Sequence, residues 1–149
     1  MSPRHTKLLV LFVALVLAGE STPRAAADGF VLIGNAKANA KTLSRAEVKA
    51  LYTGKSKTLG GSAVIVVVRP ESDAPFTQFV DQVFGIPTKT LLSKIQQEVF
   101  KGEMTKPLKA ASDDEVIQHV GAAAGNLGVV SAAGAGHLPS TVAVITIGG

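Results

Sequence analysis

The sequence contains no cysteine and no tryptophan, and its aromatic residues are one tyrosine and six phenylalanines among 149 positions. Without cysteine, the chain has no disulfide, no thiolate ligand for zinc or an iron–sulfur cluster, and no cysteine nucleophile. So few aromatic side chains also argue against the stacking platforms that bind single-stranded nucleic acid. The chain must therefore rely on an ordinary hydrophobic core for its stability.

The signatures of common catalytic and metal sites are absent as well. The sequence has no HExxH, no GxSxG and no Walker loop. His119 and His137 stand apart, without a carboxylate at metal-ligand spacing. The acidic run Asp113–Glu115 begins a predicted helix, which favours interaction with the helix dipole over calcium binding or acid–base chemistry. We expect no catalytic residue, no metal site, no cofactor and no enzymatic activity.

The first 27 residues have the order of a secretory signal peptide. Arg4 and Lys7 precede the eleven apolar residues Leu8–Ala18, and the small residues Ala25–Ala27 follow. The apolar run is shorter than the roughly 20 residues that a membrane-spanning helix requires. We therefore predict cleavage after Ala27 and a periplasmic or secreted protein that does not span the membrane. A buried N-terminal helix or an uncleaved anchor is the alternative.

Residues 28–149 are then expected to form one domain. This part has 12 basic and 10 acidic residues, so much of the charge of +4 belongs to the leader. Nucleic-acid binding requires a dense basic face, and this surplus is too small to indicate one. The basic cluster Lys37–Lys57 is interpreted as solvated surface. At 122 residues, the domain is long enough to bury a single core.

Apolar runs alternate with capped helical segments along this domain. The strongest strand pattern is Ala63–Val68, which is apolar at every position, as in a central parallel strand covered on both faces. Other strands are predicted at Phe30–Gly34, Pro107–Ala110, Gly125–Val130 and Thr141–Ile147, with a small-residue loop over Ser131–Ser140. This alternation predicts an α/β fold, a mainly parallel sheet flanked by helices.

Four helices are predicted from their start signals and apolar spacing. Ser44 with Glu47, and Ser112 with Glu115, form S-x-x-E capping boxes. Asp73 is the expected N-cap of a helix that buries residues 76, 79, 80 and 83 and ends at glycine 85. The last of the four begins at residues 87–88 and closes at residues 100–102.

The loop Arg69–Pro75 follows the central strand and begins a helix, where ligands of parallel sheets gather. Arg69 offers a bidentate partner for an oxyanion, and Ser72 offers a hydroxyl donor. Asp73 would repel an anion if it caps the helix, and Pro75 has no N–H. The residues therefore leave two interpretations open: an anion site, or a structural turn with Arg69 paired to Glu71 or Asp73.

From Thr42 to Val130 the chain resembles the short-form substrate-binding proteins of phosphate ABC transporters. The matching blocks are residues 43–55, Val66–Ser72 with phenylalanines 76 and 79, residues 99–102, and residues 125–130. The resemblance implies a single lobe of the periplasmic-binding-protein type. It also implies that Arg69 is the ligand arginine and that Glu71 replaces an aspartate. Asp73 replaces a serine of the anion loop, and a proline at 75 replaces its first threonine.

Together these observations predict an exported solute-binding protein whose ligand is a small oxyanion such as phosphate. The predicted ligand-binding residues are Arg69, Glu71, Ser72 and Asp73. Its partners would be the membrane subunits of an ABC transporter or another envelope protein. The alternative is an envelope accessory module that keeps the fold, binds a protein partner and has lost the ligand site. Full-length members of the family have two hinged lobes, of which this chain contains little more than one.

Overall fold

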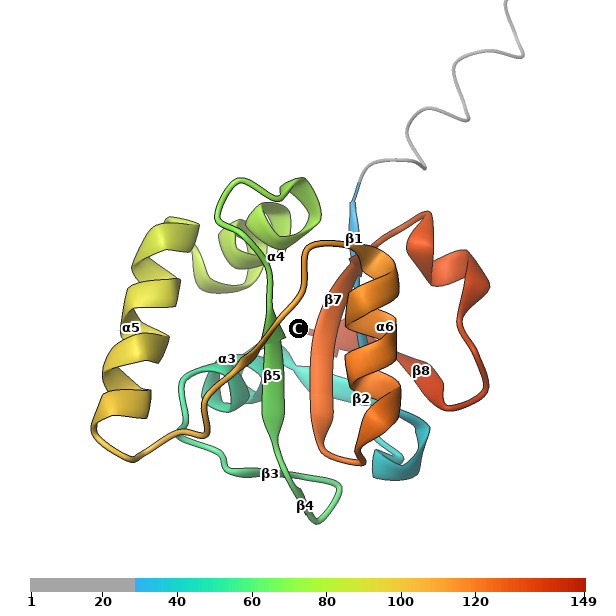
Figure 1. The fold of residues 1–149 in the computed structure, drawn as a ribbon, viewed down its shortest axis with the longest axis horizontal. Coiled ribbons are helices and arrows are strands. Elements are labelled where there is room, and N and C mark those ends of the chain that lie inside the picture. The colour runs from blue at the N-terminus through green and yellow to red at the C-terminus, as the bar shows by residue number, and fades with distance from the viewer. Residues whose placement is uncertain (1–28) are drawn as a thin grey trace, which may run out of the picture.

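The computed structural model describes residues 29–149, so the predicted leader and its cleavage site lie outside the described residues. The domain is built around a six-stranded sheet with helices on both faces (Figure 1). Its strand order is β2–β8–β1–β7–β5–β6. These strands are β1 (Phe30–Asn35), β2 (Thr42–Ser44), β5 (Ile65–Val68), β6 (Leu108–Lys109), β7 (Asn126–Ser131) and β8 (Val142–Gly148).

Five of these strands run in one direction, and β1 runs against them. β1 pairs antiparallel with β7 and β8, whereas β2 with β8, β7 with β5, and β5 with β6 are parallel pairs. The mainly parallel sheet predicted from the sequence is therefore confirmed. Because parallel neighbours end at the same edge, the carboxyl ends of β5 and β7 lie side by side.

Helices α3 (Arg45–Tyr52), α4 (Ala74–Phe84) and α5 (Thr88–Phe100) pack on one side, and α6 (Asp113–Ala122) covers the other face (Figure 1). Strand β5 shows why both faces must be covered. Val66 and Val68 belong to the core under α3 and α4, whereas Val67 belongs to the core under α6. The continuous apolar run of β5 thus serves two cores, as a central parallel strand does.

The predicted helix starts are present, with one difference. Both bonds of the Ser44–Glu47 capping box form, at 3.1 and 2.8 Å. At Ser112, the hydroxyl accepts from the Glu115 N–H at 3.2 Å, but the Glu115 carboxylate accepts from the N–H of Ala111 instead of Ser112. Only half of that capping box is formed, because the carboxylate reaches one residue further back.

The strand predicted at Ala63–Val68 begins later than predicted, and it is not in the middle of the sheet but lies next to the edge strand β6. Residues 62–63 form β4 (Ser62–Ala63), which pairs with β3 (Thr58–Leu59) across the two glycines 60 and 61, and β5 begins at Ile65. Strand β2 was not predicted; its three residues pair with the end of β8. The predicted loop after β7 contains a short 3₁₀ helix, η3 (Gly134–His137), and η2 (Ala36–Ala38) is a second one.

Candidate functional site

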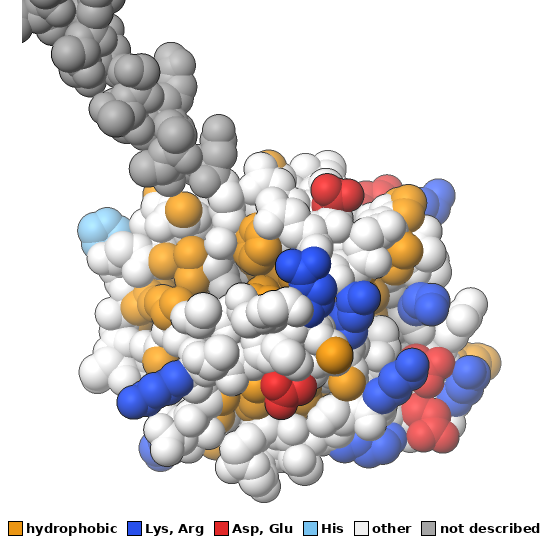
Figure 2. Space-filling view, turned by 180° about the vertical axis from the view of Figure 1, so that it is seen from behind, with side chains coloured by type: hydrophobic (Ala, Val, Ile, Leu, Met, Phe, Trp, Pro, Cys, Tyr) orange, Lys and Arg blue, Asp and Glu red, His pale blue; other side chains and the backbone are white. Residues whose placement is uncertain are grey.

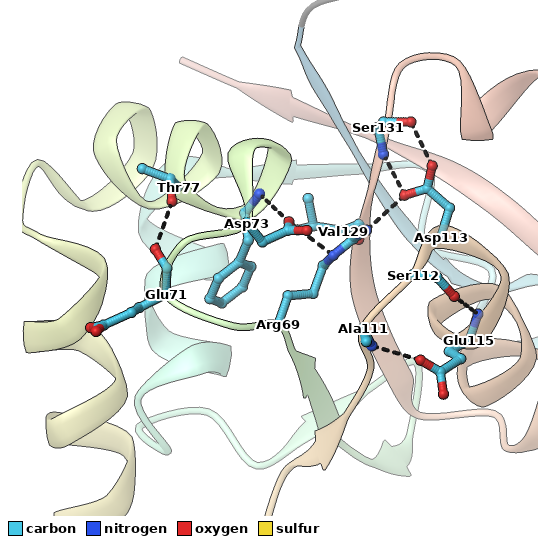
Figure 3. A network of polar contacts seen from close by, with 11 residues as sticks. Arg69, Glu71, Asp73, Thr77, Ala111, Ser112, Asp113, Glu115, Val129 and Ser131 are labelled. Carbon is cyan, nitrogen blue, oxygen red and sulfur yellow. Dashed lines mark hydrogen bonds and ion pairs between the residues drawn. The ribbon is translucent and has the colours of Figure 1, made fainter.

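Two strand ends and two helix starts meet at one edge of the sheet (Figure 3). Arg69 directly follows β5, and Ser131 ends β7. Asp73 is the N-cap of α4, where it accepts the Phe76 N–H at 3.1 Å, and Asp113 is the first residue of α6. The parallel order of β5 and β7 therefore brings Asp113 and Ser131 to the loop that holds Arg69 and Asp73, although both are more than 40 residues away from Arg69 in the sequence.

Arg69 is the centre of this cluster and is only 6% exposed. Its Nη1 donates to a carboxylate oxygen of Asp113 at 2.7 Å and to the carbonyl of Val129 at 3.1 Å. Its Nε lies 2.9 Å from a carboxylate oxygen of Asp73, an ion pair that does not have hydrogen-bond geometry. The guanidinium thus links the start of α4 to the start of α6 (Figure 3). A buried cation in this position requires such partners, since an unpaired buried charge is costly.

Asp113 is held from two sides. Besides Arg69, it accepts the Ser131 backbone N–H at 3.0 Å and the Ser131 hydroxyl. Burial raises the pKa of Asp113, but the hydrogen bonds from Arg69 and Ser131, together with the positive charge of Arg69, outweigh it and leave the pKa lowered. Ser131 in turn accepts the Gly134 N–H at 3.0 Å, which connects η3 to the cluster. The Asp113 carboxylate is therefore held ionised at neutral pH.

The structure brings two of the four predicted site residues into contact. Arg69 and Asp73 form the ion pair that the structural-turn interpretation expected. Glu71 and Ser72 are exposed and contribute no side-chain contact to the cluster among residues 29–149. The Glu71 backbone carbonyl accepts the Thr77 hydroxyl at 3.1 Å, and its side chain points away from Arg69 (Figure 3).

Sequence reasoning missed Asp113 and Ser131 as members of this cluster. Asp113 was interpreted as part of a helix start, which it also is. The available signal was topological: in a parallel sheet, the helix that precedes β7 begins beside the carboxyl ends of β5 and β7. The sequence alone did not say which strands are neighbours, so Asp113 could not be assigned to Arg69.

The charges of the cluster do not favour a negative ligand outright. One guanidinium faces two carboxylates, those of Asp73 and Asp113. The Nη2 of Arg69, however, donates to no acceptor among the described residues, and it is not among the fully enclosed atoms. An additional ligand could therefore reach Arg69 through Nη2, against the field of two neighbouring carboxylates.

Other candidate features are weaker. Within residues 29–149, no three side chains of the histidine, aspartate or glutamate type gather as a metal site would require. His119 Nε2 lies 3.2 Å from the carbonyl of Lys109. No helix in the same part of the chain is both long and apolar enough to cross a membrane. On the face shown in Figure 2, basic side chains are scattered among apolar, uncharged and acidic ones and form no dense stripe.

The strand order, the single reversed strand and the helices on both faces define one lobe of the periplasmic-binding-protein type. Comparison with solved structures supports this fold. The chain is similar to an ABC-type phosphate transport receptor from Vibrio cholerae, with a TM-score of 0.62 and 18% identity. The match covers 80% of this chain and 46% of the receptor.

Two further structures show the same relationship. A protein from Clostridium perfringens, described as a phosphate ABC transporter substrate-binding protein with bound phosphate, matches with a TM-score of 0.55 and 19% identity. PstS from Borrelia burgdorferi matches with a TM-score of 0.56 and 14% identity. The matches cover 80% of this chain and 45% and 47% of those proteins. No protein-family model and no curated protein sequence matches the chain.

The chain therefore shares its fold with part of each of these three proteins, and it spans just under half of their length. The resemblance inferred from the sequence is confirmed at the level of the fold.

Proposed function

We propose that this protein is an exported solute-binding lobe that holds a small oxyanion such as phosphate at the edge formed by Arg69 and the start of α4. It performs no catalysis in this proposal. The observation that supports it is the position of Arg69, which follows the inner parallel strand β5 of a lobe whose structural neighbours include a protein with bound phosphate. The Nη2 of Arg69, the Ser72 hydroxyl and the backbone N–H of Ala74 would contact the anion, since Pro75 has no N–H and the Phe76 N–H already donates to Asp73.

Binding at this edge is expected to be weak. Asp73 and Asp113 offset the charge of Arg69, and residues 29–149 contain no second lobe that would shield the anion from water. We therefore expect millimolar affinity for the protein alone. A partner, such as a transporter subunit or a second copy, would be needed to close the site and tighten it.

The proposal is tested by a substitution that removes the repulsion between the Asp73 carboxylate and the anion but keeps the N-cap of α4. Asp73→Ser keeps an oxygen that accepts the Phe76 N–H, removes one negative charge and breaks the ion pair with Arg69. Phosphate affinity, measured from amide shifts in NMR titrations, should rise roughly tenfold, the effect of about 1.4 kcal/mol. Asp81→Ser on the same helix is the matched control and should leave phosphate affinity unchanged.

If neither the wild-type protein nor a folded Asp73→Ser variant responds to millimolar phosphate or sulfate, the oxyanion proposal is wrong. Export is tested separately: the protein recovered from the cell envelope should begin at Asp28, as its mass would show.

The pairing of Arg69 favours a second candidate function, an envelope accessory module on the same lobe. Two of its nitrogen atoms are already engaged by carboxylates, and the exposed side chains of Glu71 and Asp114 add negative charge at this edge. Such an edge suits a basic partner protein. Loss of a cross-linked envelope partner on the double substitution Glu71→Lys and Asp114→Lys, with no response to anions, would select this candidate.

A further inference from the structure

A hollow of about 820 Å³ lies between α5 and the short edge strand β6. We call it the α5–β6 groove. It begins at the end of β5 and reaches the last turn of α5. Its apolar wall is formed chiefly by Val68, Leu92, Ile95, Val99, Phe100 and Pro107. A volume of this size and an apolar lining are typical of sites for small organic ligands.

The groove carries the most exposed large hydrophobic side chain among residues 29–149. Phe100 is 94% exposed at its mouth, and Leu92 and Val99 are half-buried along its wall. The only other large hydrophobic side chain that is strongly exposed among residues 29–149 is Val144, at 47%. Exposed aromatic surface beside a hollow costs free energy of hydration, which a bound apolar group would recover.

The charges that line the groove are mainly positive. Lys106 and Lys109 are exposed, and neither forms an ion pair with a described residue. Glu115 is the only acidic residue in the lining, and its carboxylate already accepts the Ala111 N–H at 2.7 Å. Arg69 closes the inner end, but Asp73 and Asp113 offset its charge. Two free ammonium groups therefore flank an apolar cleft.

We propose that the α5–β6 groove binds a free organic anion with an extended apolar body, of the medium-chain carboxylate type. The apolar body would lie along Leu92, Val99 and Phe100, and the carboxylate would meet Lys106 and Lys109. A bare oxyanion offers nothing to the apolar wall, and a neutral hydrocarbon leaves both lysines without a partner. This site goes beyond the oxyanion proposed at the Arg69 edge and does not depend on it.

Sodium octanoate is the probe, and NMR of the purified, isotope-labelled protein is the measurement. At millimolar concentration, octanoate should shift the amide signals of α5 and of residues 106–111 with saturation. Acetate, which has the charge without the tail, should leave these signals in place, and 1-octanol should bind more weakly than octanoate. The proposal is wrong if octanoate produces no saturable shift there, or if acetate produces the same one.

Two pairs of variants separate the contributions of charge and apolar surface. Lys106→Gln combined with Lys109→Gln should weaken octanoate binding roughly tenfold, as two exposed charge contacts would, and leave 1-octanol binding unchanged. Lys89→Gln combined with Lys94→Gln, on α5 but outside the groove, is the control. Phe100→Ser should weaken both probes, and Val144→Ser should weaken neither.

A second copy of the chain is the competing occupant. If sedimentation shows a dimer that Phe100→Ser dissociates and that octanoate does not, the groove is an interface and the proposal is overturned. The outcome is independent of phosphate binding, because the phosphate response of Asp73→Ser should be the same with and without Phe100→Ser.

Discussion

Two neighbouring regions of this lobe differ in whether their basic side chains are paired with acidic ones. At the Arg69 edge, a nearly buried guanidinium is surrounded by two carboxylates and a carbonyl. In the α5–β6 groove, Lys106 and Lys109 stand in solvent without an acidic partner among the described residues. A buried charge must be paired when the protein folds, whereas an exposed one can remain unpaired at little cost. The edge is therefore organised for stability first, and the groove remains open for binding.

The largest expected difference between the two regions comes from removing the buried guanidinium of Arg69. Arg69→Met leaves Asp73 and Asp113 facing each other and removes a donor from Val129. We expect a loss of about 3 kcal/mol, the low end for a broken buried pair, because both carboxylates retain some contact with water. Urea unfolding measures it. Lys106→Met in the groove is the control and should stay within about 0.5 kcal/mol of wild type. Equal effects of the two substitutions would contradict the comparison.

Asp113→Asn is expected to have the next largest effect. It weakens the contacts to Arg69 and Ser131 without removing the side chain, so a loss of about 1–2 kcal/mol at neutral pH is expected. Asp114→Asn, one residue further in the same helix and exposed, should change stability little.

The lowered pKa of Asp113 also predicts how the stability difference between wild type and Asp113→Asn changes with pH. Because the pKa of Asp113 is lowered in the folded protein, its contribution is fully present above the unfolded value of about 3.9. The contribution is lost as the pH falls through the lower folded value. The stability difference between wild type and Asp113→Asn should thus be constant above about pH 5 and shrink in acid. A difference that grows in acid would mean that Asp113 is not held ionised by its neighbours.

Local signals predicted most elements of the fold, and the contacts between elements were harder to foresee. Ser44 with Glu47 and the apolar run before Arg69 act within a few residues, so the sequence was sufficient for them. Strand β2 exists because it pairs with the distant end of β8, and no local pattern indicates that. Asp113 joins Arg69 for the same kind of reason, since only the strand order brings them together. The sequence singled out the loop that begins at Arg69 as a candidate site, but it did not predict that Asp113 pairs with Arg69.

The smallest expected effect on stability belongs to the groove. Phe100→Ser removes a ring that is 94% exposed, so the free energy of unfolding should change by no more than about 0.5 kcal/mol. Phe79→Ala, which empties a fully buried position among the rings of Phe30, Tyr52, Phe76 and Phe84, should cost about 3–5 kcal/mol in the same assay. If Phe100→Ser were as costly as a core substitution, its ring would be part of the packed domain. The α5–β6 groove would then be part of the packed core and not a binding surface. The contrast between the paired charges around Arg69 and an open groove would be wrong.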